Sequence, residues 1–274
     1  MSADSQKNST PAHEHNRQAW DALVRKQQRF TRPARDEDFI DPLSAIDAGG
    51  WLSGGIAGQR VLCLAAGGGR QSALYAAAGA CVTVVDISPE MLALDRQVAA
   101  ERGLDVRVVE ASMDDLSALP AGGFDLVIQP VSTCYVPDVA AVYREVARVA
   151  AAGALYISQH KQPASLQAAV GPSPRGYELT EPYYRGGPLP PVANSPHRES
   201  GTLEFLHRWE DLLGGLCRAG FAIEDLIEPL HAKPNAELGS FAHRSQYVAP
   251  YVRIKARRVG SAPSSEPTRK VWLP

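Results

Sequence analysis

The stretch Val61–Arg96 limits the possible folds of this chain more than any other part, because glycines interrupt it at one defined point. Its first apolar run, residues 61–66, is too short for an ordinary helix and leads directly into three glycines, which predicts a buried strand. Glycines at a strand-to-helix turn let the backbone approach a ligand where a Cβ would obstruct it. The helix expected next, over 71–78, points free N–H groups at that space, which suits a carboxylate or a phosphate.

An acidic residue ends the second apolar run of the same stretch. Asp86 stands nineteen positions after Gly67, at the end of the strand that this run predicts. When ionised, its carboxylate is a pure hydrogen-bond acceptor and can take both hydroxyl protons of a ribose. The glycine turn and this acid together predict a binding site for a nucleoside-containing cofactor.

The residues around the acid distinguish between two kinds of nucleoside cofactor. A dinucleotide-binding turn carries a third glycine where this chain has Ser72, and that glycine permits close helix–strand packing. The run Val85–Leu92, Val-Asp-Ile-Ser-Pro-Glu-Met-Leu, resembles the acidic second motif of the class I S-adenosylmethionine-dependent methyltransferases. Its local chemistry also suits a helix start, since Ser88 is a good N-cap and Pro89 needs no N–H partner at the first helical position.

The resemblance implies S-adenosylmethionine as cofactor, S-adenosylhomocysteine as product, and no metal. In that family the acid binds the ribose diol and the next residue packs on the adenine, and these are Asp86 and Ile87 here. The methionine tail lies along the glycine turn, and the loop after the third strand reaches the adenine. The cofactor-binding residues implied in this way are Ala65, Ala66, Gly67, Gly69, Asp86, Ile87, Met91, Ser112, Met113, Gln129 and Pro130.

Three residues depart from the usual pattern of the family. The acid that is common within the first strand is Cys63 here, and the first glycine of the loop is Ala65. The aspartate that usually meets the adenine amino group aligns with Ser112. Because the form Cys-Leu-Ala-x-Gly-Gly-Gly recurs in a bacterial subgroup of small-molecule methyltransferases, we interpret these departures as subgroup features.

The expected fold is α/β, a doubly wound, Rossmann-like sheet of seven strands with an antiparallel last strand and an insertion after strand five. Alternating strands and helices over 60–160 imply parallel pairing with right-handed crossovers. Ligands bind such sheets beyond the carboxyl ends of the strands. The later strands are expected at 106–110, 124–128, 153–157, 219–223 and 247–258, with a helix over 138–150.

Composition and pattern divide the chain into six segments. They are a disordered tail at 1–12, an N-terminal helical cap at 13–59, the cofactor-binding core at 60–160, a substrate-covering insertion at 161–206, a C-terminal completion of the sheet at 207–259, and a second disordered tail at 260–274. His13 and His15 are expected to lie in a flexible part of the chain without binding a metal.

Two of these segments are predicted to cover the site. An apolar stripe predicts a helix from Asn16 to about Gln28, and the resembling subgroup folds such a helix, with its Asn-Arg-x-x-Trp-Asp start, over the cofactor. That start corresponds to Asn16, Arg17, Trp20 and Asp21 here. The insertion is rich in proline and tyrosine, and it follows the strand after which related enzymes build a substrate lid. A surface or oligomer contact is the alternative role for this insertion.

Composition excludes several classes of function. The 274 residues, 45% of them hydrophobic, suffice for one substantial core. A net charge of −2 argues against nucleic acid as a partner. The four cysteines lack metal-ligand or disulfide spacing, and Cys63 and Cys81 are expected on buried strands, which fits a reducing cytoplasm. No apolar run reaches the ~18 residues of a spanning helix, so we expect a cytoplasmic protein without membrane contact.

The expected reaction is in-line methyl transfer to a small-molecule acceptor, with positioning as the main catalytic device. A base would help where the acceptor is protonated. The candidates are His160 after the fifth strand, Tyr135 after the fourth strand, and His207 at the start of the penultimate helix. The ordinary alternative is a histidine bonded to a backbone carbonyl and a tyrosine that only packs.

Other functions remain open from the sequence. Pro130 is followed by Val131 rather than by the second proline of the amide and base N-methyltransferases, which argues against DNA-adenine or glutamine methylation. The rival functions are an NAD(P)-dependent oxidoreductase and a degenerate cofactor-binding scaffold or sensor without catalysis.

Overall fold

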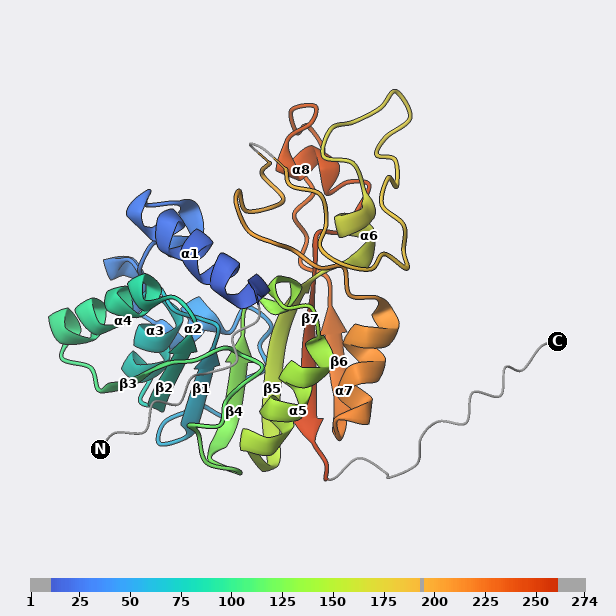
Figure 1. The fold of residues 1–274 in the computed structure, drawn as a ribbon. Helices are drawn as coiled ribbons and strands as arrows, with labels where there is room; N and C mark the ends of the chain where they lie inside the picture. Colours follow the sequence, from blue (N-terminus) through green and yellow to red (C-terminus); the bar gives the residue numbers. More distant parts are fainter. Residues whose placement is uncertain (1–10, 193–194, 261–274) are drawn as a thin grey trace.

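A seven-stranded sheet forms the centre of the computed structural model, which describes residues 11–192 and 195–260. The strand order is β3-β2-β1-β4-β5-β7-β6 (Figure 1). Strands β1 to β5 pair in parallel, and β7 runs antiparallel to both β5 and β6. The predicted Rossmann-like fold with an antiparallel last strand is therefore confirmed. The strands are β1 Arg60–Leu64, β2 Cys81–Asp86, β3 Val106–Glu110, β4 Phe124–Gln129, β5 Ala150–Lys161, β6 Phe221–Ile227 and β7 Tyr251–Arg258.

Helices cover both faces of the sheet because its strands are apolar on both sides. In β1, Val61 and Cys63 pack in one cluster with side chains of α3 and α4, whereas Leu62 and Leu64 pack in another with side chains of α5 and α7. The α-helices are α1 Pro11–Arg25, α2 Pro42–Ile46, α3 Gln71–Ala77, α4 Pro89–Arg102, α5 Val139–Val149, α6 Pro163–Gln167, α7 Gly215–Arg218 and α8 Phe241–Arg244. Short 3-10 turns lie at Arg29–Thr31, Asp36–Phe39 and Thr133–Tyr135, and a π-helical turn at Glu210–Gly214 leads into α7.

Some element boundaries and burial states differ from the prediction. Strand β5 is more than twice as long as expected and ends only at Lys161, because its polar last residues still pair with β7. Helix α1 begins at Pro11, so the predicted tail at 1–12 is wrong for its last two residues, and its remainder lies outside the described residues. Of the predicted second tail, only Gly260 is described. The thiol of Cys81, expected to be buried, is exposed at the first position of β2.

Two segments far apart in sequence build a cover above the carboxyl ends of the strands. The insertion after β5 carries α6, and the segment 228–250 between β6 and β7 carries α8; Figure 1 shows both above the same end of the sheet. The buried guanidinium of Arg244 joins them by donating to the backbone oxygens of Ser165 at 2.7 Å and Ala168 at 2.9 Å. The cover therefore includes part of the chain that was expected only to complete the sheet.

A buried ion-pair network fixes the insertion to the end of β5. The Nζ atom of Lys161 lies 2.7 Å from a carboxylate oxygen of Glu199 and 2.5 Å from one of Glu204. Arg198 pairs with the other oxygen of Glu204, whose side chain is fully buried. Burial alone would lower the pKa of Lys161, but the two carboxylates raise it above its ordinary value. The ammonium group therefore stays charged inside the protein.

We expect Lys161→Met to reduce the free energy of unfolding by about 3–5 kcal/mol, because it leaves a buried carboxylate of Glu199 without its ammonium partner. Chemical denaturation would measure the loss. The matched control is Lys255→Met, which breaks a 3.4 Å pair with Glu224 at a partly exposed position. That change should cost less than about 1 kcal/mol. Equal losses in the two variants would contradict a structural role for the buried network.

Candidate functional site

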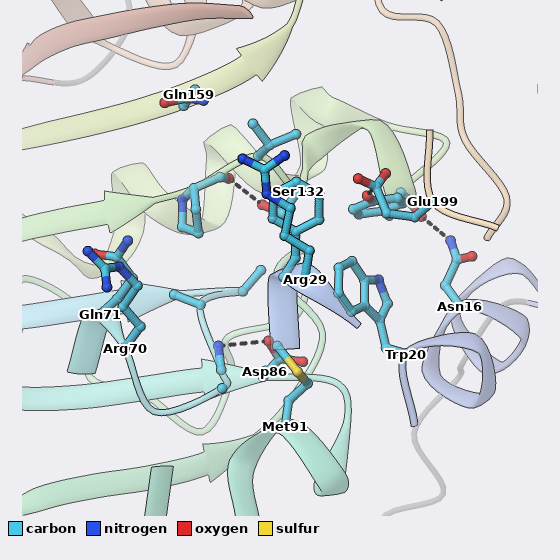
Figure 2. A pocket seen from close by; sticks show the side chains of 18 of the residues that line it. Asn16, Trp20, Arg29, Arg70, Gln71, Asp86, Met91, Ser132, Gln159 and Glu199 are labelled. Carbon is cyan, nitrogen blue, oxygen red and sulfur yellow. Dashed lines mark hydrogen bonds between the residues drawn. The ribbon is translucent and has the colours of Figure 1, made fainter. Parts of the chain in front are cut away.

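A cavity of about 650 Å³ lies above the carboxyl ends of the central strands, beneath α1 and the cover. It lies beside β1 and β4, where the strand order reverses, which is the usual ligand position in such sheets. Its volume is within the range of small-molecule sites, about 300–1,000 Å³. In Figure 2, Asp86 and Met91 line one side of this cavity, and Gln159 and Glu199 lie on the opposite side.

The glycine loop after β1 lies directly against the acid at the end of β2. The backbone N–H of Gly67 donates to Oδ2 of Asp86 at 3.0 Å (Figure 2). A Cβ at Gly67 would lie 2.8 Å from the Cβ of Met91 and 3.0 Å from that same carboxylate oxygen. This approach is therefore possible only for glycine.

Asp86 retains the capacity to bind a ligand. Its Oδ1 accepts from the backbone N–H of Ser88 at 2.9 Å, so each carboxylate oxygen has one backbone donor. A carboxylate has about four lone-pair sites, which leaves acceptor capacity for a diol. Burial raises the pKa of Asp86 to about 6, while the backbone donors of Ser88 and Gly67 act in the opposite direction. The group is therefore mostly ionised at neutral pH.

A second buried acid holds the rest of the glycine loop. Asp95, on α4, accepts from the backbone N–H of Gly68 at 2.9 Å and of Gly69 at 3.1 Å, and from the hydroxyl of Ser72. Sequence reasoning did not select this residue. A signal was present, because a charged residue stands on the buried stripe of α4 that includes Met91, Leu92, Val98 and Ala99. Burial raises its pKa to about 6.

The loop after β3 is tied to the N-terminal helix. The hydroxyl of Ser112 bonds to the carboxylate of Asp114, which also lies 3.0 Å from Nε2 of His13. The expectation that His13 belongs to a flexible part is wrong, because α1 begins before it and buries its ring beside the cavity. The hydrogen bond from Asp114 raises the pKa of His13 above its ordinary value, against the effect of burial.

Helix α1 lies over the site, as its sequence start predicted. The side-chain amide of Asn16 donates to the backbone oxygen of Tyr135 at 2.8 Å (Figure 2) and also bonds to both backbone groups of Leu203. Asp21 accepts from the hydroxyl of Ser88 at 2.6 Å. The ring of Trp20 lines the cavity and meets Tyr135 edge to face, with centroids 5.5 Å apart. Two residues of this start thus tether the helix, and the tryptophan faces the cavity.

Most of the predicted cofactor-binding residues line this cavity. They are Ala65, Ala66, Gly67, Asp86, Ile87, Met91, Ser112, Met113 and Pro130.

Gly69 and Gln129 do not line it. Gly69 faces Asp95 and α4, and Gly68 lines the cavity in its place. The buried amide of Gln129 donates to Ser132 at 2.9 Å and accepts from Tyr156, so it is engaged within the protein.

The three candidate bases have different environments. His160 lies within β5, fully buried, with its ring nitrogens each 2.8 Å from the hydroxyls of Thr133 and Ser158. Burial lowers its pKa to about 3. The prediction that its imidazole reaches the rim is wrong, because the ring is buried between the hydroxyls of Thr133 and Ser158 and meets the ring of Tyr143 edge to face. His207 also lies outside the cavity lining, and its Nε2 donates to the backbone oxygens of Thr133 and Val136.

Tyr135 is the one of the three that lines the cavity. Its hydroxyl donates to Oε2 of Glu199, in the insertion, at 2.6 Å. Burial raises the pKa of Tyr135 well above its ordinary value, and the charge of Glu199 raises it further. The phenol therefore stays protonated and acts as a hydrogen-bond donor.

Comparisons with known proteins agree with this geometry. The family model of a methyltransferase domain matches residues 62–158. The uncharacterized methyltransferase YbaJ of Bacillus subtilis (strain 168) is 32% identical over 229 residues, which cover 78% of this chain and 89% of that protein. The chain belongs to the class I S-adenosylmethionine-dependent methyltransferases. Its methyl donor is S-adenosylmethionine, and methyl transfer rather than NAD(P)-dependent oxidoreduction is its activity.

Two further similarities are more limited. A solved S-adenosylmethionine dependent methyltransferase from Mesorhizobium loti superposes with a TM-score of 0.61 at 24% identity, covering 77% of this methyltransferase and 99% of that chain, which shows a shared fold. The ubiquinone biosynthesis O-methyltransferase of Xanthomonas axonopodis pv. citri (strain 306) is 37% identical over 116 residues. That match spans 42% of this chain and 48% of the relative.

Two other features, a metal-binding cluster and a membrane-spanning helix, are absent from the described part of the methyltransferase. No group of three or more His, Cys, Asp or Glu side chains among the described residues is arranged to hold a metal ion. Within the same ranges, each helix is either too short or too polar to cross a bilayer.

We expect Ala65→Gly to stabilise the methyltransferase by about 1 kcal/mol, because Ala65 has a left-handed φ of +46° that an L side chain disfavours. Thermal unfolding would measure a higher Tm. The matched control is Ala66→Gly at the next, buried position, where φ is not positive. That change should destabilise the protein by about 0.5–1 kcal/mol. A lower Tm for Ala65→Gly would contradict the strain.

Proposed function

We propose that this methyltransferase methylates a small molecule and works mainly by positioning it. One observation supports this proposal above the others. A single cavity extends from the Asp86 side to Tyr135 and Glu199 under the insertion, so donor and acceptor would share one enclosed space. Alignment of two reactants in such a space can supply roughly 7–11 kcal/mol of barrier reduction in favourable models.

In this proposal the cofactor occupies the side of the cavity next to the glycine loop. Asp86 would accept both hydroxyl protons of the ribose, and Ile87 and Met113 would pack on the adenine. The methionine part would lie along the loop Ala65–Gly68, where the absent Cβ of Gly67 leaves room for the close approach of backbone and acid. When bound, the cofactor supplies a methyl group made electrophilic by its sulfonium.

The acceptor would lie under the cover, in contact with residues from the insertion. Tyr135 is proposed as a positioning residue, since its phenol stays protonated and its hydroxyl is already bonded to Glu199. The charge of Lys161 holds the pKa of Glu199 below its usual range although burial acts the other way. Both side chains therefore keep a fixed protonation state. Tyr135 and Glu199 would orient the acceptor by contact and hydrogen bonding, without transferring a proton to or from it.

We expect Asp86→Ala to reduce the affinity for S-adenosylhomocysteine at least tenfold, or about 1.4 kcal/mol, because it removes both acceptors of the ribose diol. Titration calorimetry would measure this loss. The control is Asp105→Ala, which removes an exposed aspartate just before β3. Unchanged affinity in a folded Asp86→Ala protein would exclude this position for the ribose.

The same carboxylate predicts how binding depends on pH. Because the pKa of Asp86 is raised to about 6, its ionised form is lost as the pH falls through that value, and affinity should decrease with it. Asp95 has a similar pKa, which the charge of Asp86 helps to raise, so removal of Asp86 should move the titration of Asp95 to lower pH. The loss of affinity near pH 6 should therefore be seen in the wild-type protein and be absent from Asp86→Ala. A difference in affinity between the two proteins that stays constant from neutral pH to well below 6 would contradict the role of the ionised acid.

The small-molecule acceptor is tested by following the methyl group. The protein is incubated with methyl-labelled S-adenosylmethionine and a cell lysate, and the label is measured after dialysis. After chromatographic removal of unreacted S-adenosylmethionine from the dialysable fraction, we expect label to remain there in another small molecule, and Asp86→Ala to reduce it at limiting cofactor. Label retained with protein or nucleic acid would contradict a small-molecule acceptor.

A further inference from the structure

Three basic side chains that line the cavity have no role in the cofactor proposal. Arg29 and Arg32 come from the segment after α1, and Lys233 comes from the segment between β6 and β7. About 200 residues of sequence separate the two segments, yet they line the same cavity. Among the described residues, no carboxylate lies within ion-pair distance of any of these three side chains.

The acidic residues of the cavity wall do not balance this charge. Only Asp86 and Glu199 contribute carboxylates to the described lining. Asp86 lies at the glycine loop, and Glu199 is already paired with Lys161 behind the wall. A fourth basic residue of the lining, Arg70, is neutralised by Asp38 at 2.6 Å. The lining of the cavity therefore carries more positive charge than its carboxylates balance.

The neutral polar group nearby is oriented as a hydrogen-bond donor. Gln159, which lines the cavity from β5, accepts at its Oε1 from Nε of Arg253 at 2.6 Å. Its amide nitrogen then remains available as a donor to a ligand in the cavity that Gln159 lines. Gln159 therefore adds a hydrogen-bond donor to the three cations, a combination that suits an oxyanion.

Aromatic rings complete the same wall. Phe241, His231 and Tyr251 all line the cavity, and the centroid of the His231 ring lies 5.4 Å from that of Phe241 and 5.5 Å from that of Tyr251. The pKa of His231 is lowered, first by burial and then by the charges of Arg253 and Arg29. The charge of Arg29 thus acts on this aromatic cluster although the two belong to opposite ends of the chain.

We propose that the acceptor is a small organic anion, whose carboxylate or phosphate group is bound by Arg29, Arg32 and Lys233 and whose apolar body packs on Phe241 and Tyr251. This inference rests on the proposed function, since it uses the same cavity, and it specifies the chemical class of the acceptor. The charge of Arg29 acts on His231 and Tyr251, which supports a role on this wall. The backbone of the same segment also meets the glycine loop, where Ala34 donates to Gly69 at 3.3 Å, so the carboxylate of the cofactor is the competing ligand that the experiments must exclude.

The test uses the protein saturated with S-adenosylhomocysteine. Aromatic and aliphatic carboxylic acids and phosphate monoesters are titrated calorimetrically, each beside its uncharged ester, amide or alcohol. We expect acids of at least one class to bind at least about tenfold more tightly than their uncharged counterparts, with an affinity that falls as salt is added. Whether carboxylates or phosphates bind identifies the anion. Equal binding of charged and uncharged probes, or no binding of any acid, would overturn the proposal.

Variants locate the effect within the cavity. Arg29→Met, Arg32→Met and Lys233→Met should each weaken binding of the preferred acid about tenfold and leave binding of its uncharged counterpart unchanged. The control is Lys26→Met, which removes the same charge from an exposed position that does not line the cavity. An equal loss of acid binding in Lys26→Met would show that the effect comes from the net charge of the protein rather than from direct contact, and it would overturn the proposal.

The affinity for S-adenosylhomocysteine distinguishes failure of the anionic-acceptor proposal from failure of the proposed function. If the three cations bind the acceptor, their variants should keep the wild-type affinity for S-adenosylhomocysteine. A tenfold loss would assign them to the carboxylate of the cofactor, overturning this inference while the proposed cofactor site remains intact. Failure of the wild-type protein to bind S-adenosylhomocysteine would instead contradict the proposed function itself.

Discussion

The site depends on hydrogen bonds between two buried carboxylates and the backbone of one loop. Asp86 accepts from Gly67, and Asp95 accepts from Gly68 and Gly69, so all three glycine N–H groups are satisfied by acids of the next strand and helix. Burying two acids side by side is costly, and the raised pKa values of both show that cost. The loop donors offset part of it. These hydrogen bonds fix the loop in a position where Gly67 and Gly68 line the cavity.

The walls of the cavity are attached to the rest of the protein by polar tethers in addition to a small apolar cluster, in which Trp20 and Tyr135 pack with Leu206 of the insertion. Asn16 joins α1 to Tyr135 after β4 and to Leu203 near the end of the insertion. Asp21 joins the same helix to Ser88 at the start of α4. Lys161 binds the insertion to the end of β5. Directional bonds of this kind fix where the cover lies. Single substitutions at the tethers, far from the reacting atoms, can therefore change the position of the cover.

The sequence predicted best what short local patterns determine. The turn at Gly67, the acid Asp86 and the helix start at Ser88 each follow from neighbouring residues, and the structure brings them together. Predictions failed where distant pairing decides the outcome. The apolar pattern of β5 weakens after Ile157, but pairing with β7 extends the strand past His160, which is buried. The proposed acceptor wall was not predictable, because Arg29 and Lys233 come to line one cavity only through the folding of segments without internal periodicity.

The family similarity covers the residues proposed to bind the cofactor but not most of those proposed to bind the acceptor. The matched family range, 62–158, contains the glycine loop, both buried acids and Tyr135. The basic and aromatic residues of the acceptor wall come from 29–32, 231–233 and 241–251, and Glu199 comes from the insertion, all outside that range. Residues in the shared core need only hold a cofactor that is the same in every member. The residues proposed to bind the acceptor lie mostly on segments outside the strands, with Tyr251 at the start of β7, so the class of acceptor must be inferred from the charge and shape of those segments.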